Sequence, residues 1–281
     1  MSSDVTHGCH TRRWAVGVVG GGVVGGATAL AYAEWAASVK VYDALPERCT
    51  APLDEVLACD VVFVCLPTPP LGHSSELDTI ALDRFFSSIK DSQANLVLRS
   101  TVPIGTTRFL SVKYNLPNLA HSPEFLTARC AALHASLPAR NIIGRLWEDQ
   151  DTLSPTGCPR KLWELYQSRW PHVTCYSMMA EESEAVKLFQ NGFFAVKVAY
   201  WNEVKALADA KGLHWNMIVR AVLADGRIHP SHTQVPGPDG KPGFGGSCLP
   251  KDLAQLVAHL GHNSVVTSAA LRRNLTDRGD Q

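Results

Sequence analysis

Residues 14–37 read WAVGVVGGGVVGGATALAYAEWAA, an apolar run that is interrupted by six glycines between positions 17 and 26. The Val-rich start, 14–20, is typical of a buried parallel strand, and the stretch after the glycines predicts a helix through about residue 37. Arg12 and Arg13 precede the run, so it imitates a membrane span or a twin-arginine signal. The glycines argue against a lipid-spanning helix, and we expect a strand, a tight turn and a helix.

The glycines at 20, 22 and 25 form a G-x-G-x-x-G motif, and Asp43 ends the next predicted strand, 39–43, 18 residues after Gly25. This context predicts a dinucleotide site. Gly20 would make the turn, Gly22 would admit the pyrophosphate beside Val24 at the helix start, and Gly25 would let helix and strand pack closely. Asp43 would accept hydrogen bonds from the ribose and repel a 2′-phosphate, which predicts NAD as the cofactor. A purely structural glycine turn is the alternative.

Further strands are expected within 60–69, 95–101, 118–125 and 139–145, alternating with helical segments. This order predicts an α/β fold whose N-terminal part is a Rossmann-type, doubly wound parallel sheet. The remainder predicts an all-helical domain built on one helix over 180–212, with more helix at 214–224 and 250–260 and a Gly/Pro-rich loop at 225–247. We therefore expect a flexible N-terminus (1–13), an NAD-binding domain (14–176) and a helical dimerisation and catalytic domain (177–281).

The composition narrows the class of partner. Lys and Arg number 26, and Asp and Glu also number 26, so no net field favours nucleic acid or an anionic membrane. Eight cysteines are scattered without a C-x-x-C pair or a zinc-type Cys/His cluster. We expect reduced thiols in a cytoplasmic protein, with no metal site.

The stretch GFGGSCLPKD, 243–252, predicts a reactive thiol. Pro250 suits the first turn of a helix, which places Cys248 just before the helix N-terminus with Lys251 in the first turn. Both features favour a thiolate, and Asp252 follows on the same side. An inert cysteine in a flexible loop is the alternative.

Lys187 and Asn191 are four residues apart on the long predicted helix and share a face with Ala195 and Val198. A bound substrate could partner the amine and the amide on this otherwise apolar stripe. Taken alone, the pair favours the alternative, a solvated Lys–Asn edge.

These residues and motifs together resemble the UDP-glucose/GDP-mannose dehydrogenase family. The similarity runs in order through VGVVGGGVVG, DVVFVCLPTPP, STVPIGTT, HSPEFL, NIIG, EAVKLFQNGFFAVKVAYWNEV, DGRI and GFGGSCLPKDL. The resemblance implies a four-electron, NAD-dependent oxidation of a primary alcohol to a carboxylate. The substrate would be a nucleotide sugar or a related smaller alcohol.

The resemblance also implies a role for each matched residue. Cys248 would attack the intermediate aldehyde, and Lys187 and Asn191 would stabilise the oxyanion. Asp252 and Glu124, with Thr101, would position or activate water. Cofactor contacts are implied for Thr68, Thr101 and Lys251, and substrate contacts for Phe125, Leu126, Arg227, Phe244 and Gly245. Arg227 would reach the substrate of a neighbouring subunit, and the long helix would form a homodimer interface.

Two features depart from the family pattern. Ala128 stands where a second glutamate usually follows that of SPEFL, and the sequence stops at Gln281, where the family continues into a nucleotide-binding domain. We therefore expect a smaller alcohol, a wall supplied by another subunit, or weak binding of the sugar nucleotide. A two-electron β-hydroxyacid-type dehydrogenase and a non-catalytic dinucleotide-binding protein remain alternatives.

Overall fold

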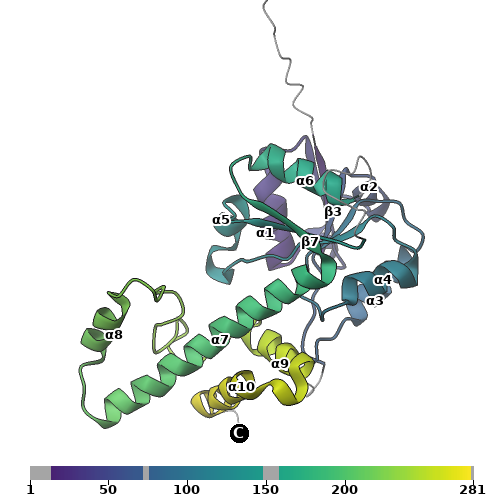
Figure 1. The fold of residues 1–281 in the computed structure, drawn as a ribbon. Helices are drawn as coiled ribbons and strands as arrows, with labels where there is room; N and C mark the ends of the chain where they lie inside the picture. The colour runs from purple at the N-terminus through teal and green to yellow at the C-terminus, as the bar shows by residue number, and fades with distance from the viewer. Residues whose placement is uncertain (1–13, 72–75, 148–157, 280–281) are drawn as a thin grey trace, which may run out of the picture. The chain divides into compact units, whose positions relative to one another are not determined.

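The computed structural model describes residues 14–71, 76–147 and 158–279, so the predicted flexible N-terminus lies outside the described residues (Figure 1). Two compact units divide the chain. Unit 1 comprises the described residues of 14–66, 86–100 and 107–183, and unit 2 comprises those of 67–85, 101–106 and 184–279.

Unit 1 is built on a seven-stranded sheet in the order β2-β1-β3-β4-β5-β6-β7. Its strands are β1 (Ala15–Val19), β2 (Ser38–Tyr42), β3 (Val61–Val64), β4 (Leu96–Leu98), β5 (Leu119–His121), β6 (Asn141–Arg145) and β7 (Cys175–Met179). The first six lie within the predicted stretches or begin one residue before them. β7 was not predicted, because its half-exposed sequence CYSMM carries no run of buried apolar residues.

The sheet confirms the Rossmann-type prediction with one difference. β2 and β3 flank β1 in parallel, with Val16 opposite Val39 and Val61, so the strand order reverses at β1. β5 and β6 are antiparallel through His121 and Gly144, so the expectation of an entirely parallel sheet is wrong at this pair. β6 starts at the end of the sheet where β5 stops, and the connecting segment therefore needs no crossover of the sheet.

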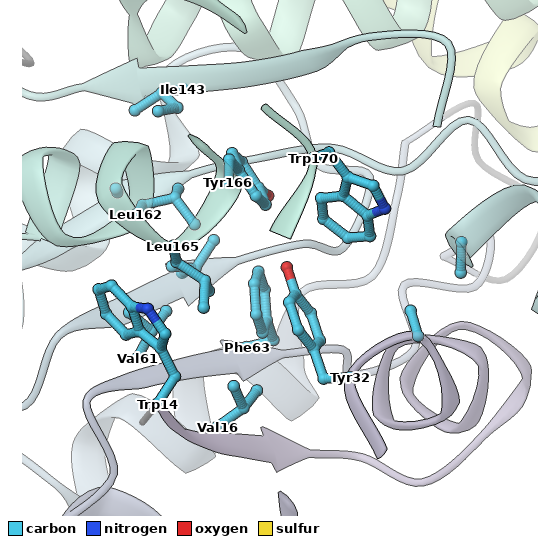
Figure 2. Packing of buried hydrophobic residues seen from close by; sticks show 14 of the residues in the cluster. Trp14, Val16, Tyr32, Val61, Phe63, Ile143, Leu162, Leu165, Tyr166 and Trp170 are labelled. Carbon is cyan, nitrogen blue, oxygen red and sulfur yellow. The ribbon is translucent and has the colours of Figure 1, made fainter. Parts of the chain in front are cut away.

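Helices connect these strands. They are α1 (Val23–Ala33), α2 (Leu53–Leu57), α3 (Ile80–Ser88), α4 (Thr106–Tyr114), α5 (Ala131–Ser136) and α6 (Cys158–Arg169), with 3₁₀ turns η1 (Pro46–Arg48) and η2 (Ala128–Cys130). α1 ends four residues before the predicted limit of residue 37. Tyr32 on α1 packs against Phe63 of β3 and Trp170, with ring centroids 5.8 and 5.4 Å apart (Figure 2). The core of unit 1 thus ties α1 to the sheet that it follows.

The helical region predicted after the sheet is present. α7 (Ala180–Ala210) is 31 residues long, and α8 (Trp215–Leu223), α9 (Leu249–Leu260), η3 (Gly261–Asn263) and α10 (Val265–Arg278) follow it. α10 was not predicted. A small core of unit 2 packs α7, α9 and α10 together, with Ala195 of α7, Leu253 of α9 and Ala270 of α10 buried in one cluster.

Candidate functional site

The glycine loop has the geometry of a phosphate cradle. Gly20 has φ +92°, and a Cβ at this position would lie 2.6 Å from the Cys65 carbonyl oxygen, so only glycine fits this turn. A Cβ on Gly25 would lie 1.7 Å from the Gly20 carbonyl oxygen, which is the close packing of helix and strand that the motif predicts. No other described group lies within 4 Å of the position that a Cβ on Gly22 would take, so a ligand has access to the Gly22 backbone.

Helix α1 begins directly after Gly22, which is its N-cap residue. Glycine has no side chain with which to cap the first N–H groups of the helix, and no acidic residue occupies the first turn. Free N–H groups and the positive end of the helix dipole favour an anion at this point. Val24, half-buried in the first turn, lies beside this anion position.

Asp43 is held by backbone donors one residue beyond β2. Its Oδ2 accepts a hydrogen bond from the Gly21 N–H at 2.5 Å, and its Oδ1 accepts one from the Leu45 N–H at 2.8 Å. The bond from Leu45 is the largest cause that holds the pKa of the carboxyl below its ordinary value, with Gly21 and the Arg48 guanidinium adding to it. Each oxygen retains a second lone pair, so the carboxylate can also accept bonds from a ribose.

Arg48 was not singled out from the sequence. It ends η1, and its Cβ comes within 3.2 Å of the point where a Cβ on Gly21 would lie, so it borders the glycine loop. A cation beside Asp43 was not recognisable from the sequence because no motif spacing marks it.

Thr68 and Thr101 are joined in unit 2. The buried Thr68 hydroxyl donates to the Thr101 carbonyl oxygen at 2.7 Å. This bond links the segment after β3 to the segment after β4. It uses the backbone of Thr101, so the Thr101 hydroxyl takes no part in the contact with Thr68. The two predicted cofactor residues therefore share one local structure.

Glu124, Phe125 and Leu126 follow β5 in unit 1. The buried Glu124 carboxylate accepts a hydrogen bond from the Leu126 N–H at 2.5 Å, which folds the segment back on itself. The Arg140 guanidinium lies over the Phe125 ring, 4.1 Å from its centroid. Ala128 is exposed at the start of η2, so the missing glutamate leaves an apolar methyl group at this surface.

Lys187 and Asn191 are buried on α7, with exposed fractions of 4% and 6%, so the alternative of a solvated Lys–Asn edge is wrong. Asn191 Nδ2 donates to Asp252 Oδ2 at 2.6 Å, and the Asp252 side chain is itself buried. Lys251 Nζ lies 2.6 Å from Asp252 Oδ1. The positive charge of Lys251, which the sequence analysis expected to favour the Cys248 thiolate, is therefore offset by Asp252.

Cys248 is the N-cap residue of α9, and Pro250 lies in the first turn, as predicted. The residue is exposed, and its Sγ lies 3.7 Å from Ser247 Oγ. A backbone bond from the Asp252 N–H to the Cys248 carbonyl oxygen, 3.0 Å long, starts the helix. Among the seven cysteines in the described part of the chain, all free thiols, Cys248 and Cys130 are exposed. Burial raises the pKa of Cys65 to about 12, so that thiol is a poor nucleophile.

Two of the glycines before Cys248, Gly243 and Gly245, lie against protein neighbours, whereas no described group lies within 4 Å of the position that a Cβ on Gly246 would take. A Cβ on Gly243 would lie 2.5 Å from Asn274 Oδ1, and one on Gly245 would lie 2.8 Å from the Arg278 guanidinium. Asn274 Oδ1 accepts the Phe244 N–H at 2.6 Å, and Arg278 donates to the Gly243 carbonyl oxygen at 3.1 Å. These α10 residues, which the sequence did not indicate, anchor the loop.

Phe244 and Arg227, both predicted substrate residues, differ in exposure. The Phe244 side chain is buried in the core of unit 2, so its backbone is the part that could meet a ligand. The Arg227 side chain is 87% exposed and is paired with Asp225.

The described residues contain neither a membrane-spanning helix nor a cluster of metal ligands. No helix there combines the length and apolarity needed to cross a membrane. No three His, Cys, Asp or Glu side chains gather there in a way that could hold a metal ion.

Comparison with known proteins gives two domain matches. The NAD-binding domain of the UDP-glucose/GDP-mannose dehydrogenase family matches residues 47–168, and the central domain of the same family matches residues 181–275. The UDP-glucose 6-dehydrogenase of Campylobacter jejuni is 33% identical over 202 residues, and that of Streptococcus pneumoniae is 28% identical over 209 residues. Each alignment covers 71% of this chain and 48% or 50% of the relative, so the chain spans about half the length of these relatives.

Solved structures share the fold. A UDP-glucose dehydrogenase from Pyrobaculum islandicum superposes with a TM-score of 0.81 at 24% identity, covering 95% of this chain and 69% of the other. A 3-hydroxyisobutyrate dehydrogenase from Mycobacterium tuberculosis superposes with a TM-score of 0.70 at 18% identity, covering 96% of this chain and 95% of the other. The domain match bears out NAD as the cofactor, and the structural matches confirm the fold class.

Proposed function

Because the chain belongs to the UDP-glucose/GDP-mannose dehydrogenase family, we propose that it oxidises a primary alcohol to a carboxylate in two NAD-dependent steps through a thioester on Cys248. One observation carries the proposal. Cys248, whose thiol is exposed, is the N-cap residue of α9, while the first turn of that helix brings Asp252 into a buried contact with Asn191 of α7. An inert loop cysteine would not require this surrounding structure.

The residues of unit 1 fit a dinucleotide. The N–H groups at the start of α1 would hold the pyrophosphate, the open backbone of Gly22 would let it approach, and the Asp43 carboxylate would accept the ribose hydroxyls. When bound, NAD would supply the hydride acceptor for both oxidations. A 2′-phosphate would face the negative charge of Asp43, so NAD is preferred over NADP. Thr68, Thr101 and Lys251 are the further proposed contacts.

The first oxidation converts the alcohol to an aldehyde, with loss of a hydride from carbon and of the hydroxyl proton. The Cys248 thiolate then attacks the aldehyde carbon, and a proton taken up on oxygen completes a thiohemiacetal. Lys187 and Asn191 would stabilise the oxyanion that develops during this attack, since both are buried donors on one face of α7. Burial makes such donors more effective because water does not compete for the oxyanion.

The second oxidation removes a hydride from the thiohemiacetal carbon and the hydroxyl proton, which leaves a thioester on Cys248. Water then attacks the carbonyl carbon, the carbon–sulfur bond breaks, and the carboxylate leaves as the thiol is restored. Asp252 and Glu124 are the proposed groups that take the proton of the water, and Thr101 would position it. A thiol nucleophile must be reduced, which agrees with the proposed cytoplasmic location.

A nucleotide sugar or a smaller related alcohol is the proposed substrate, since the relatives from C. jejuni and S. pneumoniae are UDP-glucose 6-dehydrogenases. Phe125, Leu126 and the backbone at Phe244 and Gly245 are the proposed contacts. Arg227, with its exposed guanidinium, suits a contact with the substrate of a neighbouring subunit.

A homodimer through α7 is supported by its exposed apolar stripe. Phe189, Phe193, Tyr200 and Leu207 are each more than half exposed. Their spacing of four, seven and seven residues places them on one face of the helix. Water contact over four large side chains of one helix face is unfavourable, and a second copy would cover them.

The test is the ratio of NADH formed to alcohol consumed, with UDP-glucose as the first substrate and free sugars, sugar phosphates and nucleosides as the panel. A ratio of two supports the proposal, a ratio of one supports a two-electron dehydrogenase, and no NADH across the panel supports a non-catalytic protein. Cys248→Ser should abolish carboxylate formation, and Cys130→Ser, which changes the other exposed thiol of the described residues, should not. Carboxylate formation at the wild-type rate by Cys248→Ser would refute the thioester.

A further inference from the structure

A cavity of about 200 Å³ in unit 1 is lined by a half-buried cation that the proposed reaction does not use. Its wall is formed by the end of β4, the segment after β5, the α5–β6 connection and α6. The polar residues that matter are Arg99, His134, Arg140, Asn141 and Tyr166, and Trp170 adds an aromatic wall. The glycine loop and Asp43 do not line it, so it is distinct from the dinucleotide site, although Glu124, Phe125 and Leu126 of the proposed reaction also border it.

Arg99 has no carboxylate partner among the residues that the structure describes. Its Nη1 donates to the Tyr166 hydroxyl at 3.3 Å, and its guanidinium lies over the Phe63 ring, 5.2 Å from the centroid. Its Nε is buried and has no hydrogen-bond partner in the described structure. Arginine keeps its charge in proteins, so this cation cannot escape the cost of burial by losing a proton.

Two other groups in the wall are donors. Asn141 is 93% buried, and its Nδ2 also lacks a hydrogen-bond partner in the described structure. His134 Nδ1 accepts the Thr127 N–H at 3.0 Å, so the ring carries its hydrogen on Nε2. The acid in the described wall, Glu124, uses Oε2 to accept the Leu126 N–H. Arg99, Asn141 and His134 therefore contribute donor groups to the wall.

We propose that this cavity binds a small oxyanion, a phosphate or a carboxylate group, with Arg99 as its principal partner. The planar guanidinium matches the oxygens of both groups, and a bound anion would neutralise a charge that the described residues leave without an anionic partner. The volume holds about six waters at roughly 30 Å³ each, which suits a single phosphate or a short carboxylic acid. The proposal does not depend on the chemistry at Cys248.

The test is isothermal titration of the whole chain with inorganic phosphate, and separately with acetate, at an ionic strength held constant with chloride. Saturating NAD is present in one arm to occupy the glycine loop, the other place where phosphate could bind. Wild-type protein should bind one anion with NAD present, and the tighter of the two anions identifies the group. Arg99→Met, which keeps the length of the side chain, should weaken binding at least tenfold. Arg84→Met, which changes an exposed arginine on α3, should bind as the wild type does.

Asn141→Asp is the second variant and covers the case in which Arg99→Met does not fold. It places a carboxylate in the cavity wall, so it should also weaken anion binding at least tenfold. Circular dichroism shows which variants are folded. The proposal is overturned if the wild type binds neither anion, if a folded variant binds as tightly as the wild type, or if NAD abolishes all anion binding.

Discussion

Asn274 anchors the glycine-rich stretch before Cys248, and we expect Asn274→Ala to loosen that stretch without unfolding unit 2. Asn274 is buried on α10, and its Oδ1 accepts the Phe244 N–H at 2.6 Å. Alanine would leave this buried N–H without an acceptor, which costs about 1–3 kcal/mol. The neighbouring Gly243 N–H keeps its acceptor, Asn202 Oδ1 at 2.9 Å, so the loss is local.

Hydrogen exchange followed by mass spectrometry measures this loss. A cost of about 1–3 kcal/mol corresponds to roughly 5- to 150-fold faster exchange at the amides of 243–248, since about 1.4 kcal/mol is a factor of ten. Asn274→Asp retains the acceptor and should exchange close to the wild-type rate. Thr276→Ala, at an exposed position on the same helix, is the matched control. Wild-type exchange in Asn274→Ala would refute the anchoring role of α10.

Three further changes test the cofactor site and the dimer. Gly25→Ala should abolish NAD binding measured by calorimetry, because the new Cβ would lie 1.7 Å from the Gly20 carbonyl oxygen. Gly26→Ala is the control and should still bind NAD, because the atom nearest to its new Cβ is 3.6 Å away. Asp43→Ala should lose the preference for NAD over NADP, and unchanged relative Kd values would contradict the ribose contact. Phe193→Asp should convert a dimer to a monomer by light scattering, because it charges the centre of the exposed α7 stripe; a monomeric wild type would end that proposal.

The loss of NAD affinity at low pH should follow the pKa of Asp43. This pKa is lowered in the folded protein, chiefly by the hydrogen bond from Leu45. A lowered pKa means that the folded protein stabilises the Asp43 carboxylate. The contribution of this group to folding stability is therefore complete above the unfolded-state pKa, and it is lost as the pH falls through the folded-state pKa. NAD affinity should therefore persist at mildly acidic pH and fall only below the ordinary range for aspartate. Titrations across pH with Asp43→Asn as the control check this, and an equal pH dependence in both proteins would contradict it.

The sequence by itself determined the strand, turn and helix at 14–37, the acidic residue at 43, the long helix and the position of Cys248 before α9. These features depend on backbone preferences of nearby residues: glycines that adopt positive φ or lack a Cβ, a proline in a first helical turn, and an uninterrupted helical run. Such preferences depend on residues that are close together in the sequence, so the residue types and their spacing are enough to predict these features.

Only the tertiary structure decided which partners these residues have. Lys187 is buried within unit 2, and Lys251 is paired with a carboxylate that also contacts α7. Gly243 and Gly245 lie against residues of α10, and Arg99 faces a cavity walled by segments up to 71 residues later in the chain. Each of these contacts joins residues that are far apart in the sequence. A local pattern cannot predict such a contact, because its free energy depends on a partner in another helix or strand.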